Sequence, residues 1–135
     1  MKQGTAICYG LAVCDVLIPG ISRDAFHAET TRIPSFSYNT GGDAINEAIT
    51  LVKLGHQARL MSLVGRDLFG DFILQQGAQA GVDMGGVGRH PNLPTTVSLV
   101  CIHPDGERSF IINHGADNAL SEDCIDWTAL KDADV

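Results

Sequence analysis

The chain has 135 residues, 44% of them hydrophobic, which is enough for one globular domain with a buried core. Nine Lys and Arg residues stand against sixteen Asp and Glu residues, so the net charge is −7 and no basic stripe is available for a nucleic-acid backbone. No stretch approaches the roughly 20 apolar residues that span a bilayer. The composition therefore argues against nucleic-acid and membrane partners and predicts a soluble protein.

The cysteines and histidines give no sign of a metal or redox site. The four cysteines form no Cys-x-x-Cys pair, so reduced thiols in a cytoplasmic protein are the simplest interpretation. The five histidines, at positions 27, 56, 90, 103 and 114, show no ligand spacing. We therefore predict cytoplasmic localisation and no metal site in this chain.

The N-terminal half predicts a strand, a helix and a second strand. Thr5 to Ile18 is rich in Ile, Val, Leu and Cys with little alternation, as in a strand covered on both faces of a parallel sheet. Apolar residues between Ala44 and Val52 recur at helical spacing, and Gly55 follows where a helix C′ residue belongs. Ala58 to Val64 is again strand-like. The segment from Pro19 to Thr40 is too long for an ordinary connection, so we expect it to contain strands lying off the main sheet.

The next segments predict a helix and a β-hairpin. The helix is expected from about Asp67 to Ala80, with Gly81 ending it and Gly77 inside it at a cost of about 1 kcal/mol relative to Ala. Thr96 to His103 and Glu107 to Asn113 are rich in strand-forming residues. The sequence Pro-Asp-Gly between them predicts a tight hairpin turn.

The C-terminal segment predicts a short helix and the beginning of a strand. Ser121 can cap a helix that carries Trp127 and Leu130, with acidic residues favourably placed in its first turn. Ala133 to Val135 then resembles the first step of another strand. A parallel sheet that stopped there would leave an unpaired edge, so we expect either a truncated chain or a partner that completes the sheet.

The most informative motif surrounds Gly41 and Gly42. Two glycines permit a close backbone approach, and the free N–H groups at the start of the following helix can face a hydroxyl or an anion. Asn46, just inside that helix, offers both a donor and an acceptor to a polyol. The alternative is that Gly-Gly is a generic loop and that Asn46 is a tolerated exposed residue.

An ordered series of motifs resembles the PfkB-type (ribokinase-like) carbohydrate kinase family, in its N-terminal portion. The spacing Gly-Gly-x-x-x-Asn-x-Ala begins at Gly41, Leu-Gly follows, and Val-Gly-x-Asp-x-x-Gly begins at Val64. A Gly-x-x-x-x-Asp opening ends at Asp15, and Gly115 to Leu120 is similar to the segment that leaves the family's β lid. The likeness covers essentially the whole chain, and the order of the motifs is more specific than any one of them.

The resemblance implies an α/β fold, with a ribokinase-like three-layer α/β/α (Rossmann-like) core and a small β-strand lid. Residues 1–135 would form the N-terminal part of a single kinase domain. The core is expected at 1–15, 41–93 and 116–135, and the lid at approximately 16–40 and 94–115. Relatives commonly dimerise through this lid, so a homodimer of this chain is left open.

The same resemblance implies the residues that bind the sugar. Asp15 and Asn46 match residues that bind sugar hydroxyls in relatives, and the backbone around Gly41 and Gly42 would pack against the sugar ring. A carboxylate can accept two hydroxyl hydrogen bonds without any chemistry of its own, which suits Asp15. The alternative for Asp15 is a loop carboxylate that caps local N–H groups. Two lid residues are aligned more weakly with pocket-facing positions, namely Ser98 and Ile112.

Asp43 departs from several branches of the family, which place Lys, Ala or another residue there. We hypothesise that its charge adds a hydroxyl acceptor and disfavours acidic sugars. The alternative is a first-turn acid that is favoured by the helix dipole.

No catalytic residue is expected in this chain. The family's Gly-Ala-Gly-Asp motif, whose Asp serves as the base, is absent, and so is a Gly-x-x-x-x-Gly-Lys-Ser/Thr loop. The resemblance implies ATP and Mg²⁺ as cofactors, with their main binding residues outside this sequence, and the chain alone is expected to be inactive. Two other functions stay open: a non-catalytic sugar-binding or dimerisation module, and half of a dinucleotide-binding oxidoreductase, which lacks the glycine fingerprint.

Overall fold

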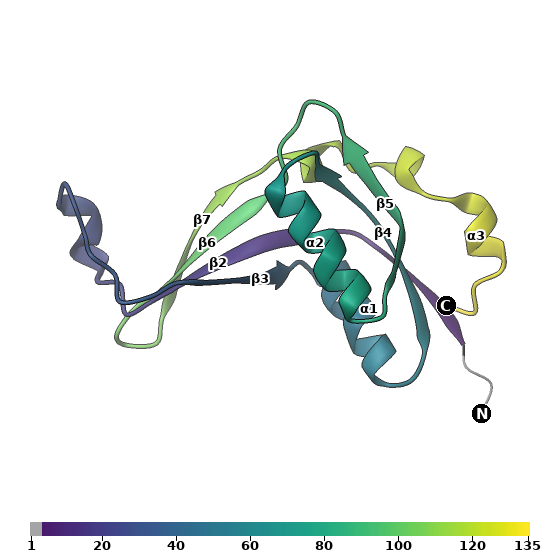
Figure 1. Ribbon diagram of the computed structural model, residues 1–135, viewed down its shortest axis with the longest axis horizontal. Coiled ribbons are helices and arrows are strands. Elements are labelled where there is room, and N and C mark those ends of the chain that lie inside the picture. Colours follow the sequence, from purple (N-terminus) through teal and green to yellow (C-terminus); the bar gives the residue numbers. More distant parts are fainter. Residues whose placement is uncertain (1–3) are drawn as a thin grey trace.

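The computed structural model describes residues 4–135, which form two β-sheets and the helices that flank them (Figure 1). The first sheet, here called the core sheet, has the strand order β1-β4-β5 with all strands parallel. The second, the lid sheet, has the order β3-β2-β6-β7, with β2 parallel to β6 and both edge strands antiparallel to their neighbours. The strands are β1 (Thr5–Tyr9), β2 (Val13–Pro19), β3 (Ser37–Gly41), β4 (Gln57–Gly65), β5 (Asp83–His90), β6 (Val97–Ile102) and β7 (Arg108–Asn113).

The two long helices begin and end close to where the sequence predicts. In α1, Gly55 adopts a φ of +90°, and the N–H of His56 donates to the carbonyl of Leu51 at 3.0 Å, which completes a glycine-terminated helix end. In α2, Gly81 has a φ of +88° and the same arrangement follows it. The helices are α1 (Asp43–Lys53), α2 (Leu68–Gln79) and α3 (Trp127–Lys131), with 3₁₀ turns at η1 (Arg23–His27), η2 (Ala116–Ala119) and η3 (Glu122–Cys124). No helix within residues 4–135 is long and apolar enough to cross a membrane.

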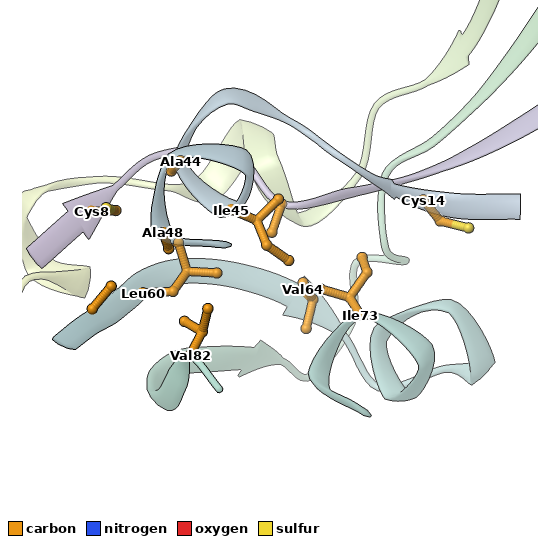
Figure 2. Packing of buried hydrophobic residues seen from close by; sticks show 11 residues of the cluster. Cys8, Cys14, Ala44, Ile45, Ala48, Leu60, Val64, Ile73 and Val82 are labelled. Carbon is orange, nitrogen blue, oxygen red and sulfur yellow. The ribbon is translucent and has the colours of Figure 1, made fainter. Parts of the chain in front are cut away.

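The hydrophobic core lies between the core sheet and the two long helices. Ile45 of α1, Leu60 and Val64 of β4 and Ile73 of α2 are each 0% exposed. Figure 2 shows these side chains clustered between the helices and β4, with Val82 beside Leu60. Fully burying one such side chain is worth about 1.5 to 3 kcal/mol, so this cluster fixes both helices on the sheet.

The single long strand predicted from Thr5 to Ile18 is wrong, because the chain forms two strands that belong to different sheets. The N–H of Gly10 donates to the carbonyl of Met61 at 3.2 Å, and Gly10 adopts a φ of +153°, which ends β1. The N–H of Cys14 donates to the carbonyl of Thr96 at 3.1 Å, so β2 is already part of the lid sheet. Asp15 therefore lies inside the lid sheet and not at the end of a core strand, and the lid begins earlier than residue 16.

The segment from Pro19 to Thr40 carries β3, which pairs with β2 in the lid sheet, as the prediction of strands off the main sheet requires. The predicted hairpin is confirmed by the antiparallel pairing of β6 with β7. In its turn, the N–H of Gly106 donates to the carbonyl of His103 at 2.9 Å, and Gly106 has a φ of +86°. At the other end of the chain, the predicted cap is wrong. Ser121 makes no side-chain cap, whereas the Asp126 carboxylate accepts hydrogen bonds from two N–H groups at the start of α3.

The last residues run beside β1, in line with the predicted strand step. The N–H of Asp134 donates to the carbonyl of Thr5 at 2.8 Å, and the N–H of Ile7 donates to the carbonyl of Val135 at 2.8 Å. This is the beginning of a ladder on the free edge of the core sheet. Figure 1 shows this end of the chain far from the tip of the lid sheet, where η1 lies.

Candidate functional site

A cavity of about 210 Å³ lies where the lid sheet meets the start of α1. Four of the predicted sugar-binding residues line it: Asp15, Gly42, Ser98 and Ile112. Three of them come from adjacent strands in register, because Asp15 pairs with Ser98 and Ser98 pairs with Ile112. Residues opposite one another on neighbouring strands point to the same face of a sheet, so the lid sheet places these side chains in one row.

Asp15 presents an unpartnered carboxylate to this cavity. The side chain is half-buried and accepts no hydrogen bond from any group in residues 4–135. Burial raises the pKa of Asp15, because the charged form loses solvation and no neighbouring donor compensates for the loss. Asp15 therefore does not cap local N–H groups, which was the alternative prediction for this residue. Asp15 is thus a hydrogen-bond acceptor without a partner among residues 4–135.

The glycine pair is required by the contacts around it. A Cβ atom on Gly41 would overlap the carboxylate of Asp15, so only glycine leaves room for that side chain. Gly42 has a φ of +101°, in the left-handed region that favours glycine, and a Cβ atom there would overlap the carbonyl of Leu11. The two glycines thus bring the start of α1 close to β2 and its carboxylate.

Asn46 and Asp43 lie outside the cavity. Asn46 is exposed on α1 and lines a separate, shallow hollow together with Glu47. Asp43 uses its Oδ1 atom to accept hydrogen bonds from the N–H of Leu11 at 3.2 Å and from its neighbour Ala44 at 2.8 Å. Asp43 therefore holds the break between β1 and β2 against the helix start, which favours the structural alternative for this residue.

The structure adds six cavity residues that were not predicted from the sequence: the apolar Leu11, Val13 and Phe110 and the polar Thr96, His114 and Asp117. The side chain of Asp117 is only 8% exposed and accepts a hydrogen bond from the Thr96 hydroxyl. The N–H of Gly115 donates to its Oδ1 atom at 2.8 Å, and Nδ1 of His114 lies 2.7 Å from its Oδ2 atom. In the sequence, the pair His114 and Asp117 could have been found only from its His-x-x-Asp spacing directly after a predicted strand.

These donors keep Asp117 charged. Burial alone would raise the pKa of Asp117, but the hydrogen bonds from Thr96, His114 and Gly115 together hold it below its ordinary value. The cavity therefore has two carboxylates of different character. Asp15 is unpartnered, whereas Asp117 is fully engaged and orients the groups around it.

Asp67, in the Val-Gly-x-Asp motif, has a structural role. Its Oδ1 atom accepts hydrogen bonds from the N–H of Gly70 at 2.9 Å and from the Thr95 hydroxyl at 2.6 Å, and its Oδ2 atom accepts one from the N–H of Thr95 at 2.8 Å. Burial would raise the pKa of Asp67, but these hydrogen bonds and the charge of Arg89 lower it overall. Asp67 joins the start of α2 to the chain entering β6, and so holds the lid sheet on the core.

Comparison with solved structures defines the class of fold. The chain superimposes on a fructokinase from Xylella fastidiosa with a TM-score of 0.80 and 28% identity, covering 97% of this chain and 41% of that one. A ribokinase from Thermotoga maritima gives a TM-score of 0.83 at 24% identity, covering 98% and 43%. The fold is therefore the ribokinase-like α/β fold, as predicted.

Residues 4–135 match the pfkB family carbohydrate kinases, and the chain belongs to this family. Fructokinase-1 from Zea mays is 34% identical over 104 residues, which are 76% of this chain and 32% of that protein. Deoxyribokinase from Salmonella typhi is 28% identical over 101 residues, or 75% and 33%. The chain thus spans about a third of the length of these curated relatives.

Proposed function

We propose that the cavity between the lid sheet and α1 binds a sugar, and that the chain acts as the N-terminal sugar-binding portion of an ATP-dependent carbohydrate kinase that phosphorylates a sugar hydroxyl. The observation that carries this proposal is the unpartnered carboxylate of Asp15. The Asp15 side chain is half-buried, so its carboxylate loses part of its hydration without gaining a protein donor, and sugar hydroxyls are donors that a carboxylate can use in pairs.

A few polar and charged side chains distinguish the cavity from a second hollow beside the lid sheet. A larger hollow of about 420 Å³ lies on the other side of the lid, but its lining is Val16, Leu68 and four aromatic residues, with no charged group. The smaller cavity is also mostly apolar, with Leu11, Val13 and Phe110 in its lining, but it contains hydrogen-bonding side chains that a sugar can use: Asp15, Ser98 and His114. The names of the relatives, among them fructokinases and deoxyribokinase, agree with a sugar as the ligand.

ATP and Mg²⁺ are implied by the family, and a fructokinase from Xylella fastidiosa has been solved with ATP bound. The described residues do not fit a triphosphate. Among residues 4–135, no Lys or Arg lines the cavity. The N-terminus of α2 is already capped by the carboxylate of Asp67. No step of phosphoryl transfer follows from these residues, and we expect ATP turnover by this chain with a panel of sugars to stay at background in a coupled assay.

Sugar titration by isothermal calorimetry tests the proposal. We expect the wild-type chain to bind at least one neutral sugar of a panel, and Asp15→Asn to weaken that binding about 10- to 100-fold, because a hydrogen bond to a charged group is worth about 1.5 to 3 kcal/mol. Gly41→Ala should weaken it too, since the new methyl group displaces the Asp15 carboxylate. Gly4→Ala is the matched control, because its Cβ atom would meet only ordinary contacts at 3.7 Å. A wild-type chain that binds no sugar, or equal affinities for wild type and Asp15→Asn, would contradict the proposal.

A second candidate is a dimerisation module, and one observation favours it. The edge strand β7 exposes three consecutive apolar residues, with Phe110 at 55%, Ile111 at 45% and Ile112 at 47% exposure. An apolar edge strand is a surface for pairing with another chain. Sedimentation equilibrium of wild type and Ile111→Lys distinguishes the cases: a dimer that the substitution dissociates supports pairing through the lid, and a monomeric wild type excludes it.

A further inference from the structure

His114 stands at the end of β7 and lines the cavity that contains Asp15. The ring is more than half exposed, with a side-chain exposure of 57%, but its orientation is fixed on one side. Nδ1 lies 2.7 Å from the Asp117 carboxylate, which is itself held by the Thr96 hydroxyl and the N–H of Gly115. A buried and fully engaged carboxylate therefore orients the imidazole at the cavity.

The charge of Asp117 determines which ring nitrogen carries the proton. An ionised carboxylate only accepts hydrogen bonds, so Nδ1 of His114 must be the donor in this pair. In the neutral imidazole the other nitrogen, Nε2, is then an acceptor. Within residues 4–135 no hydrogen bond is made to Nε2. When the ring is neutral, the pair therefore leaves a second unpartnered acceptor on a residue that lines the same cavity as Asp15.

The cavity lining combines these acceptors with negative charge. Asp15 and Asp117 are both acidic, and among the described residues His114, which is paired with Asp117, is the one basic side chain on the cavity lining. Hydroxyl groups can donate to the Asp15 carboxylate and to Nε2 of His114. A carboxylate or phosphate on the ligand offers no donor to either group, and it would meet two like charges.

We propose that His114 contacts the substrate through Nε2 as a hydroxyl acceptor, with Asp117 as its positioning residue, and that the cavity in this way selects neutral polyhydroxy compounds over sugar acids and phosphorylated sugars. The inference rests on the proposed function, since it assigns a ligand class to the same cavity. It also moves the discrimination against acidic sugars from Asp43, whose carboxylate is used by backbone N–H groups, to residues that line the cavity.

Two substitutions separate contact with the ligand from support of Asp117. In His114→Asn, the amide can still donate to Asp117 but no longer reaches the position of Nε2. In His114→Ala, both functions are lost. The probe is the neutral sugar that the wild-type chain binds best in calorimetry, together with its monodeoxy analogues. We expect His114→Asn and His114→Ala to weaken binding of the parent sugar about 3- to 10-fold, as the loss of one hydrogen bond predicts.

The deoxy analogues provide a readout that a purely structural role would not change. For the one analogue that lacks the contacted hydroxyl, wild type and His114→Asn should bind equally. The aldonic acid and the phosphate ester of the same sugar should bind the wild-type chain at least about 10-fold more weakly than the parent. Nitrogen NMR of the imidazole should report the proton of His114 on Nδ1 in the wild-type chain and a mixture of tautomers in Asp117→Asn.

The outcomes distinguish this inference from the proposed function. If the wild-type chain binds sugar and Asp15→Asn weakens binding while His114→Asn binds like wild type, the proposed function stands and the role of His114 is refuted. Equal affinity of the wild-type chain for the neutral sugar and its acid would refute the proposed selectivity. A proton on Nε2 of His114 in the wild-type chain would refute its role as an acceptor. If the wild-type chain binds no sugar, both the proposed function and this inference fall together.

Discussion

The core sheet and the lid sheet belong to one chain but differ in burial and in role. The core sheet is parallel, and side chains such as Leu60 and Val64 have no exposure at all beneath α1 and α2. The lid sheet leaves large apolar residues such as Tyr38 and Phe110 more than half exposed, and its strands carry Asp15 and Ser98 of the cavity. The difference suggests that the core supplies most of the folding free energy, whereas the lid holds groups whose partners are absent from the folded chain alone.

Truncation of the core should have the largest effect on stability. Leu60→Ala removes a fully buried side chain at the centre of the cluster, and we expect it to cost about 2 to 5 kcal/mol of unfolding free energy in urea denaturation. Leu54→Ala is the matched control, because Leu54 is 70% exposed and should cost less than about 0.5 kcal/mol. Similar losses in the two variants would contradict the division of tasks.

The link between the two sheets should have an intermediate effect. Asp67→Ala removes a helix cap and two hydrogen bonds to Thr95, and we expect a loss of about 1 to 2 kcal/mol at neutral pH. Because the folded-state pKa of Asp67 is lowered, its contribution is present above the unfolded value and is lost as the pH falls through the folded value. The gap between wild type and variant should therefore shrink below about pH 4.

Denaturation at several pH values checks the prediction for Asp67. Asp71→Ala serves as the control on the same helix, because the Asp71 side chain is 64% exposed and its ion pair with Arg89 should contribute less than about 1 kcal/mol. A loss in Asp67→Ala that is independent of pH would show that the carboxylate does not act through its charge.

The smallest effect is expected in the cavity, and it has the opposite sign. The folded-state pKa of Asp15 is raised by burial, so the ionised group costs stability as the pH rises through that value. Asp15→Asn should therefore unfold at a slightly higher temperature than wild type at pH 7, and the difference should vanish at acid pH, where wild-type Asp15 is protonated. Differential scanning calorimetry measures both, with exposed Asp123→Asn as the control. A lower unfolding temperature for Asp15→Asn at pH 7 would mean that the folded chain already supplies a partner for this carboxylate.

The sequence predicts the strongly patterned parts of the core and misses β5. The helical spacing of apolar residues and the glycines that follow them predict α1 and α2, because each helix buries the face on which those apolar residues recur. The strand β5 reads Asp-Met-Gly-Gly-Val-Gly-Arg-His, and glycine is poor in strands. Its place in the sheet depends on a tertiary contact, since a Cβ atom on Gly86 would lie 2.5 Å from the carbonyl of Leu60. The composition of the segment does not predict this close contact between β5 and β4.

The candidate site could likewise be predicted only in part from the sequence. Asp15, Ser98 and Ile112 could be assigned from their positions in the family motifs, and the strand register places them in one row. The pair His114 and Asp117 could not, because its importance depends on the Thr96 hydroxyl and on a cavity that only the folded chain creates. The break between β1 and β2 could not be predicted for a related reason, since both strands are largely apolar and the break depends on the conformation of Gly10 and on the hydrogen bond from Leu11 to Asp43.

Mapping of the bound sugar by NMR tests the central claim most directly. The backbone amides of the uniformly ¹⁵N-labelled chain would be followed while the best-binding neutral sugar is added. We expect the largest shift changes at Asp15, Gly42, Ser98 and His114, with little change along the apolar hollow around Phe36. Shift changes centred on that hollow, or on Asn46 and its neighbours in α1 with the lid sheet unchanged, would contradict that claim.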